Sequence, residues 1–196
     1  MTGKRGRPSA GEKAQRHERV VDVVVALLAA EGYGAVGFDR VSTEAQVAKR
    51  TLYADYGDRL GLVRAAVRRQ HAYADEAWTA EADLRAASVS VVAHLLDDDA
   101  IAVHRALVGA AGADASLAAE FYEQGPGRAQ RFLVAHLPPD AADRGDLLFA
   151  ALLGEPHRRR LLGLAPAPTP AEVEAHVDRV LTALALGGAG ETPPRA

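Results

Sequence analysis

The fold is decided by the stretch Val41-Ser42-Thr43-Glu44-Ala45-Gln46-Val47-Ala48-Lys49-Arg50-Thr51-Leu52-Tyr53. Its apolar residues are spaced to close a small hydrophobic core, and the chain from Phe38 to about Tyr56 is too short for strands with their own turns. Two short helices that cross at a steep angle, separated by Thr43-Glu44-Ala45-Gln46, fit this spacing best. The stretch therefore predicts a helix-turn-helix.

The same spacing leaves basic and hydroxyl side chains on the outside of the second helix. These are Lys49, Arg50, Thr51 and Tyr53, and Arg59 follows shortly after them. Arginine and lysine can reach guanine edges in the major groove of DNA, and hydroxyl groups can reach phosphates. The segment is therefore a candidate for reading DNA. The alternative is a compact helical subdomain whose basic face is merely solvated.

Charge is divided unevenly along the chain. The net charge of −3 would by itself argue against nucleic acid. Residues 1–70 contain 13 Lys and Arg against 8 Asp and Glu, a net of +5, so residues 71–196 contain 10 against 18, a net of −8. A nucleic-acid module joined to an acidic partner domain would show this division.

The rest of the chain has helical periodicity and no convincing strand, so an all-α fold is expected. A helix over about 16–31 would end at Gly32, and Asp58 is a plausible N-cap for a longer connecting helix. Further helices are expected at roughly 84–97, 100–111, 115–136, 140–163 and 170–186. The predicted domains are a disordered basic arm at 1–14, a helix-turn-helix domain at 15–57, a helical domain at 58–186 that includes the connecting helix, and a disordered tail at 187–196.

The chain lacks the residues that several classes of protein function require. The chain has no cysteine, which excludes disulfides and thiolate metal sites and fits a reducing cytoplasm. Its histidines are scattered without metal-ligand spacing, and Asp97-Asp98-Asp99 is better explained as a loop or a helix cap than as a cation site. Phosphate loops, nucleophile elbows, signal peptides and membrane spans find no match in the sequence. We therefore expect a cytoplasmic protein that is not an enzyme and needs no metal or cofactor.

The helix-turn-helix resembles that of the TetR/AcrR family of bacterial transcriptional regulators. The matching residues are Val41, Ser42, Ala45, Val47, Lys49, Arg50, Thr51, Leu52, Tyr53, Tyr56, Asp58, Arg59 and Leu62, preceded by Glu31-Gly32-Tyr33. The resemblance implies that Lys49, Thr51 and Tyr53 contact DNA from the recognition helix. It also implies that Arg59 holds a phosphate, and Arg50 and Thr43 are further candidates for DNA contact.

Four residues depart from the family pattern. Gln46 stands where the family usually has the turn glycine, so its backbone must either bend differently or accept a left-handed conformation at a cost of roughly 1 kcal/mol. Gly37 replaces the usual Ser or Thr cap, Asp55 replaces a common histidine, and Asp39 is an acidic group near the expected DNA backbone. These departures predict a modest affinity for the operator.

The N-terminal arm contains Arg5-Gly6-Arg7-Pro8, which resembles the core of an AT-hook. Two arginines that flank a glycine can lie in the narrow minor groove of A·T tracts. The alternative is a basic arm that finds phosphates without reading sequence. Both interpretations make Arg5 and Arg7 candidate DNA contacts with a salt-dependent contribution.

The C-terminal half resembles the AefR-like domain of some TetR regulators over residues 118–128, 147–163 and 169–177. Gly125-Pro126-Gly127 should break or kink a helix, because proline lacks an amide donor and clashes with the preceding turn. In the resembling family such a kink lies near the ligand cavity. The candidates to line that cavity are His104, Phe121, Tyr122, Phe132 and Phe149. The alternative for each is an ordinary core aromatic or a capped or solvated histidine.

The last two expected helices, about 140–163 and 170–186, carry more apolar residues than a terminal helix pair in a monomer usually needs. By resemblance they form a four-helix homodimer interface, and a two-fold dimer suits palindromic half-sites. Arg158-Arg159-Arg160 is interpreted as a solvated face or an ion-pair partner in that interface, with anion binding as the alternative.

These features together predict a ligand-responsive transcriptional regulator. It would be a repressor that a small apolar or amphipathic effector releases from double-stranded operator DNA. The alternative is a helical small-molecule-binding or scaffold dimer whose DNA binding is weakened.

Overall fold

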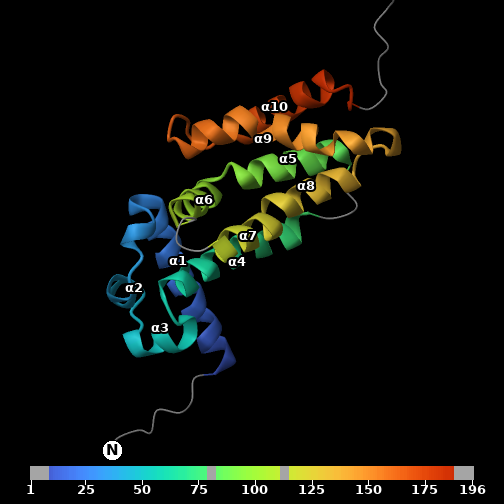
Figure 1. The fold of residues 1–196 in the computed structure, drawn as a ribbon. Coiled ribbons are helices and arrows are strands. Elements are labelled where there is room, and N and C mark those ends of the chain that lie inside the picture. Colours follow the sequence, from blue (N-terminus) through green and yellow to red (C-terminus); the bar gives the residue numbers. More distant parts are fainter. Residues whose placement is uncertain (1–8, 79–82, 111–114, 188–196) are drawn as a thin grey trace, which may run out of the picture. The chain divides into compact units, whose positions relative to one another are not determined.

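The computed structural model describes residues 9–78, 83–110 and 115–187. The regular elements in these ranges are helices, with no strand among them, which confirms the expected all-α class (Figure 1). The chain divides into two compact units after Arg69, which we call the N-terminal unit and the C-terminal unit. None of the helices in the described ranges combines the length and the apolar character that a membrane span requires.

The two units differ in the helices that they contain. The N-terminal unit contains α1 (Ala10–Glu31), the 3₁₀ turn Tyr33–Ala35, α2 (Phe38–Glu44), α3 (Lys49–Tyr56) and the first part of α4 (Arg59–Ala77). The C-terminal unit contains the remainder of α4, α5 (Leu84–Leu95), α6 (Asp98–Ala110), α7 (Ala115–Gln124), α8 (Pro126–Ala135), the 3₁₀ turn Pro139–Arg144, α9 (Gly145–Leu161) and α10 (Pro170–Ala183).

Helix α1 begins earlier than its apolar periodicity predicts. The Ser9 hydroxyl accepts a hydrogen bond from the amide of Glu12 at 3.2 Å, and the Glu12 carboxylate accepts one from the amide of Ser9 at 2.7 Å. This capping box satisfies amides that the first turn of a helix leaves without partners. The prediction of a disordered arm is therefore wrong for residues 10–14. The remainder of that arm, residues 1–8, and residues 188–196 of the predicted tail lie outside the described residues.

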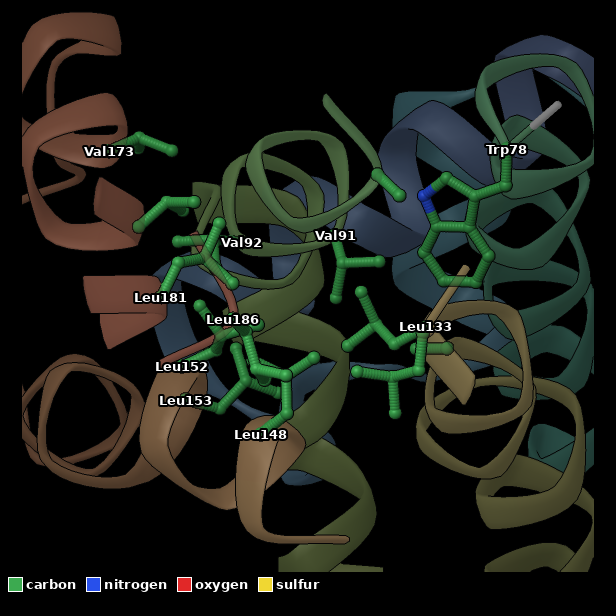
Figure 2. Packing of buried hydrophobic residues seen from close by; sticks show 14 of the residues in the cluster. Trp78, Val91, Val92, Leu133, Leu148, Leu152, Leu153, Val173, Leu181 and Leu186 are labelled. Carbon is green, nitrogen blue, oxygen red and sulfur yellow. The ribbon is translucent and has the colours of Figure 1, made fainter. Parts of the chain in front are cut away.

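Helices α5, α8, α9 and α10 enclose the core of the C-terminal unit (Figure 2). Its fully buried side chains come from all four helices and include Val91, Val92, Leu133, Leu148, Leu152 and Val177. Helix α10 packs mainly on α5, and Arg85 of α5 donates from Nε to the Asp178 carboxylate of α10 at 2.7 Å. Burial of this apolar surface is the main force that holds the four helices together.

Helix α9 continues through Pro156, which cannot donate the backbone hydrogen bond that the carbonyl of Leu152 would receive in a regular helix. His176 of α10 takes this place, because its Nε2 donates to the Leu152 carbonyl at 2.9 Å. The acceptor that proline leaves unused therefore ties α10 to α9.

Arg160 corrects the interpretation of Arg158-Arg159-Arg160 as a solvated face or interface ion-pair partner. Only 7% of its side chain is exposed. It donates from Nε to the carbonyl of Leu96 at 2.9 Å and from Nη1 to the carbonyl of Ala165 at 3.0 Å, and it pairs with Asp98. Arg158 and Arg159 are exposed. Arg160 therefore connects α9 both to the turn between α5 and α6 and to the segment that follows α9.

We expect Arg160→Met to lower the free energy of unfolding by about 2 kcal/mol or more, because it leaves carbonyls without the donor they face. Arg159→Met is the matched control, since Arg159 is its exposed neighbour on the same helix, and it should change stability by less than about 0.5 kcal/mol. Urea denaturation followed by circular dichroism measures both variants. Equal effects of the two substitutions would show that the Arg160 contacts contribute nothing to the fold.

Candidate functional site

Of the two backbone conformations that the sequence allows for the turn between α2 and α3, the structure has the left-handed one at Gln46. Gln46 has a φ of 55°, in the left-handed region, and the following amide of Val47 donates to the carbonyl of Ser42 at 3.1 Å. The turn therefore keeps its shape without a glycine, at a cost of roughly 1 kcal/mol. Gly37 precedes α2 and supplies no side-chain cap.

The end of α3 is anchored to α1 by two polar contacts. The hydroxyl of Tyr56 and Nδ1 of His17 lie 2.9 Å apart, and Arg16 donates to the Asp55 carboxylate at 3.1 Å. Burial, with the charge of Asp55 as a second cause, raises the pKa of Tyr56 to about 12, so its hydroxyl stays protonated at neutral pH. Asp55, which departs from the family pattern, thus has a structural role in fixing α3.

Two of the outward side chains of α3 have partners on α2. The ring of Tyr53 stacks on the ring of Phe38 with 4.1 Å between centroids and 4° between planes, and 55% of Tyr53 remains exposed. Lys49 forms an ion pair with Asp39 of α2. Arg50 is exposed and Thr51 is half-buried. The structure therefore presents these four candidates along one short helix.

The other candidate DNA contacts lie outside α3. The guanidinium of Arg59 lies over the ring of Tyr33, 5.6 Å from its centroid. The hydroxyl of Thr43 donates to the carbonyl of Asp39 at 3.0 Å, within α2. Arg5 and Arg7 lie outside the described residues.

A pocket of about 590 Å³ opens within the C-terminal unit. Four of the five predicted ligand-binding residues line it, and these are His104, Phe121, Tyr122 and Phe149. Phe132 does not; it stacks on the indole of Trp78 with 5.5 Å between centroids and packs against the core. The predicted break of the helix is also observed, because α7 ends at Gln124 and α8 begins at Pro126, and Gly125 and Pro126 line the pocket.

Sequence reasoning missed four other lining residues that carry rings. They are His71, Trp78, His94 and His157. Histidines that are scattered along the sequence are thus gathered at one cavity, although no cluster of metal-ligating side chains is found among the described residues. Helical spacing could have predicted that His157 lines the pocket. Leu153 and Ala150 precede it by four and seven residues, lie on the same face of the helix and line the same pocket.

Three of the four pocket histidines have a lowered pKa, which favours the uncharged form of the ring. His104 and His157 have ring centroids 4.9 Å apart. Burial, assisted by the nearby His157, lowers the pKa of His104 to about 4. Burial also lowers the pKa of His157 and of His94. These rings therefore offer the pocket one donor and one acceptor nitrogen each and no positive charge.

Two family models match the chain. Residues 20–66 match the model of bacterial regulatory proteins of the tetR family, and residues 82–185 match the model of the C-terminal domain of AefR-like transcriptional repressors. Among curated proteins no significant match was found.

Solved structures share the fold at low sequence identity. A TetR-family transcriptional regulator from Mesorhizobium loti, described as putative, is similar over 87% of this chain and 95% of its own, with 20% identity and a TM-score of 0.74. A TetR regulator from Agrobacterium tumefaciens is similar over 86% of this chain and 94% of its own, with 23% identity and a TM-score of 0.63. The Flavonoid-responsive Regulator FrrA is similar over 87% and 97%, with 19% identity and a TM-score of 0.64.

Substitution by alanine at two glycines of the pocket is expected to change the free energy of unfolding in opposite directions. A Cβ at Gly125 would lie 2.7 Å from Nε2 of His71 and 3.0 Å from the carbonyl oxygen of Phe121, whereas a Cβ at Gly154 of α9 would meet nothing within 4 Å. Gly125→Ala should lower the free energy of unfolding by about 1–2 kcal/mol through overpacking. Gly154→Ala should raise it by about 0.5–1 kcal/mol, because alanine favours a helix.

Urea denaturation of the two variants checks this expectation. Stabilisation by Gly125→Ala, or destabilisation by Gly154→Ala, would mean that the contacts around the break between α7 and α8 are not those described.

Proposed function

The chain belongs to the TetR family of bacterial transcriptional regulators, and we propose that its α3 reads operator DNA until an effector in the pocket of the C-terminal unit releases the protein. Members of this family are ligand-responsive DNA-binding repressors that act as dimers. The chain is accordingly a transcriptional regulator and not an enzyme. The observation that carries the proposal is the set of basic and hydroxyl side chains that α3 presents while α1 anchors its far end.

On the DNA side, α3 would enter the major groove. Lys49 and Arg50 begin the helix and Tyr53 stands one turn later with its ring already stacked on Phe38, so little side-chain freedom is lost when the hydroxyl meets a phosphate. Arg59 and Thr43 would add contacts to the DNA backbone, as would Arg5 and Arg7 of the arm. Asp39 opposes this interaction, because it holds Lys49 and places a negative charge beside the phosphates.

On the effector side, the predominantly apolar and aromatic lining supports a small apolar or amphipathic molecule. Helix α4 begins in the N-terminal unit, and its residues Gln70 and His71 line the pocket. One continuous helix therefore leads from the DNA-reading unit to the effector. An effector that fits the pocket better in one position of α4 would shift the population toward that position and away from the DNA-bound state.

A homodimer through α9 and α10 would supply the two-fold symmetry that a palindromic operator needs. Leu147 of α9 is 55% exposed, and Leu162, the C-cap of the same helix, is 66% exposed. These exposed leucines support this surface as the interface. The regulator would act in the cytoplasm, where the operator lies.

Substitutions on α2 and α3 should change operator affinity in both directions. Tyr53→Phe keeps the ring stack and removes the hydroxyl, and Lys49→Ala removes a cation. Each should weaken binding by about tenfold, which corresponds to about 1.4 kcal/mol. Asp39→Asn should strengthen binding, because it frees Lys49 and removes a charge that repels phosphates. A mobility-shift titration with the DNA upstream of the protein's own gene measures all three.

Arg131→Ala is the matched control, since it removes one exposed cation from α8 of the other unit and should leave operator affinity unchanged. Equal losses in Arg131→Ala and Lys49→Ala would mean that only overall charge matters. If the unaltered protein forms no salt-sensitive specific complex but still binds ligand as a dimer, the helical ligand-binding or scaffold dimer is the correct reading.

Leu147→Glu should weaken the dimer by about tenfold or more, because it places a charge in an apolar interface. Sedimentation velocity over a range of protein concentrations measures the dissociation constant. Glu155→Gln, at an exposed position two turns along α9, is the comparison. A dimer that tolerates Leu147→Glu would place the interface elsewhere.

A further inference from the structure

The described residues that line the pocket of the C-terminal unit are mostly apolar or aromatic, with Gln70 and Gln124 among the polar exceptions, and none of them carries a permanent charge. Among its described lining residues are four histidines, Trp78, Phe121, Tyr122 and Phe149, and there is no Asp, Glu, Lys or Arg. An ion that enters such a site loses its hydration and gains no counter-charge. The lining therefore favours uncharged ligands.

Two of the polar side chains that line the pocket form a pair of imidazoles. His104 of α6 and His157 of α9 lie with ring centroids 4.9 Å apart, and the ring of Phe121 lies 5.1 Å from that of His104. Because burial lowers the pKa of both histidines, each ring is neutral and presents a nitrogen that accepts a hydrogen bond. A hydroxyl group can donate to such a nitrogen while its aromatic ring meets Phe121.

Trp78 contributes ring surface to the pocket. The residue is 8% exposed, lines the pocket and also belongs to the core cluster. Its Nε1 is buried and has no hydrogen-bond partner among the described residues. The indole therefore offers a ligand an aromatic surface rather than a hydrogen-bond donor.

We infer that the pocket selects an uncharged, flat aromatic compound that carries at least one hydroxyl group, with the hydroxyl bound by the His104–His157 pair. Aromatic faces of the lining hold the rings, and the imidazole pair distinguishes a phenol from a hydrocarbon of the same shape. Among the described lining residues a carboxylate finds no cation and an ammonium ion no anion. This inference rests on the proposed function only in taking the pocket as the effector site.

The test uses three probes of nearly equal shape: biphenyl, para-phenylphenol and para-phenylbenzoate. Trp78 is the only tryptophan of the chain, so its fluorescence reports occupancy of the pocket in the full-length protein, and calorimetry checks the affinities. At neutral pH, para-phenylphenol should bind at least tenfold more tightly than either of the other two probes. In His104→Phe and His157→Phe the ratio between para-phenylphenol and biphenyl should fall toward one while biphenyl still binds.

Arg131→Ala is the control, because Arg131 is an exposed residue of α8 that does not line the pocket, and it should keep the ratio of the unaltered protein. Tightest binding of para-phenylbenzoate, equal binding of all three probes, or an unchanged ratio in both phenylalanine variants would overturn the inference. A mobility-shift assay with the same probes separates this result from the proposed function. A phenol selected by the pocket that fails to release DNA would contradict the effector role and leave the ligand class standing.

Discussion

Proline cannot donate a backbone hydrogen bond, and the C-terminal unit depends on where its prolines stand. Pro126 begins α8 after the break at Gly125, and both residues line the pocket. Pro156 interrupts the hydrogen bonding of α9 without ending it, and the free carbonyl of Leu152 becomes the attachment point for His176. The same chemical property thus accompanies a helix break beside the cavity at one place and frees a carbonyl that joins two helices at another.

The two units are stabilised in different ways. The N-terminal unit must hold a short helix rigidly, and it does so with polar contacts at the far end of α3 and an aromatic stack on its outer face. The C-terminal unit must keep a cavity open beside a packed core. It does so by placing apolar side chains toward the core and rings toward the cavity on neighbouring turns of the same helix, as Leu152 and His157 of α9 illustrate.

Sequence reasoning was most successful where local chemistry decides the outcome. The helix-turn-helix, the left-handed alternative for Gln46 and the break at Gly125 follow from residue types within a few positions of one another. It failed where the partner lies far away in the chain. The burial of Arg160 depends on the carbonyl of Leu96, which is 64 residues away in the sequence, as well as on that of Ala165. The gathering of His71, His94, His104 and His157 depends on how four helices pack, and no spacing in the sequence encodes it directly.

The ion pair between Asp39 and Lys49 bears on how salt would act on the proposed complex with DNA. A lysine that comes to a phosphate from solution displaces condensed cations, and each displacement makes affinity fall as ionic strength rises. Lys49 already pairs with a carboxylate of its own chain. Under the proposed mode of binding, salt would weaken this intramolecular pair as well as the pair with a phosphate. The two effects oppose each other, so the affinity contributed by Lys49 would fall less with ionic strength than that of an unpaired lysine.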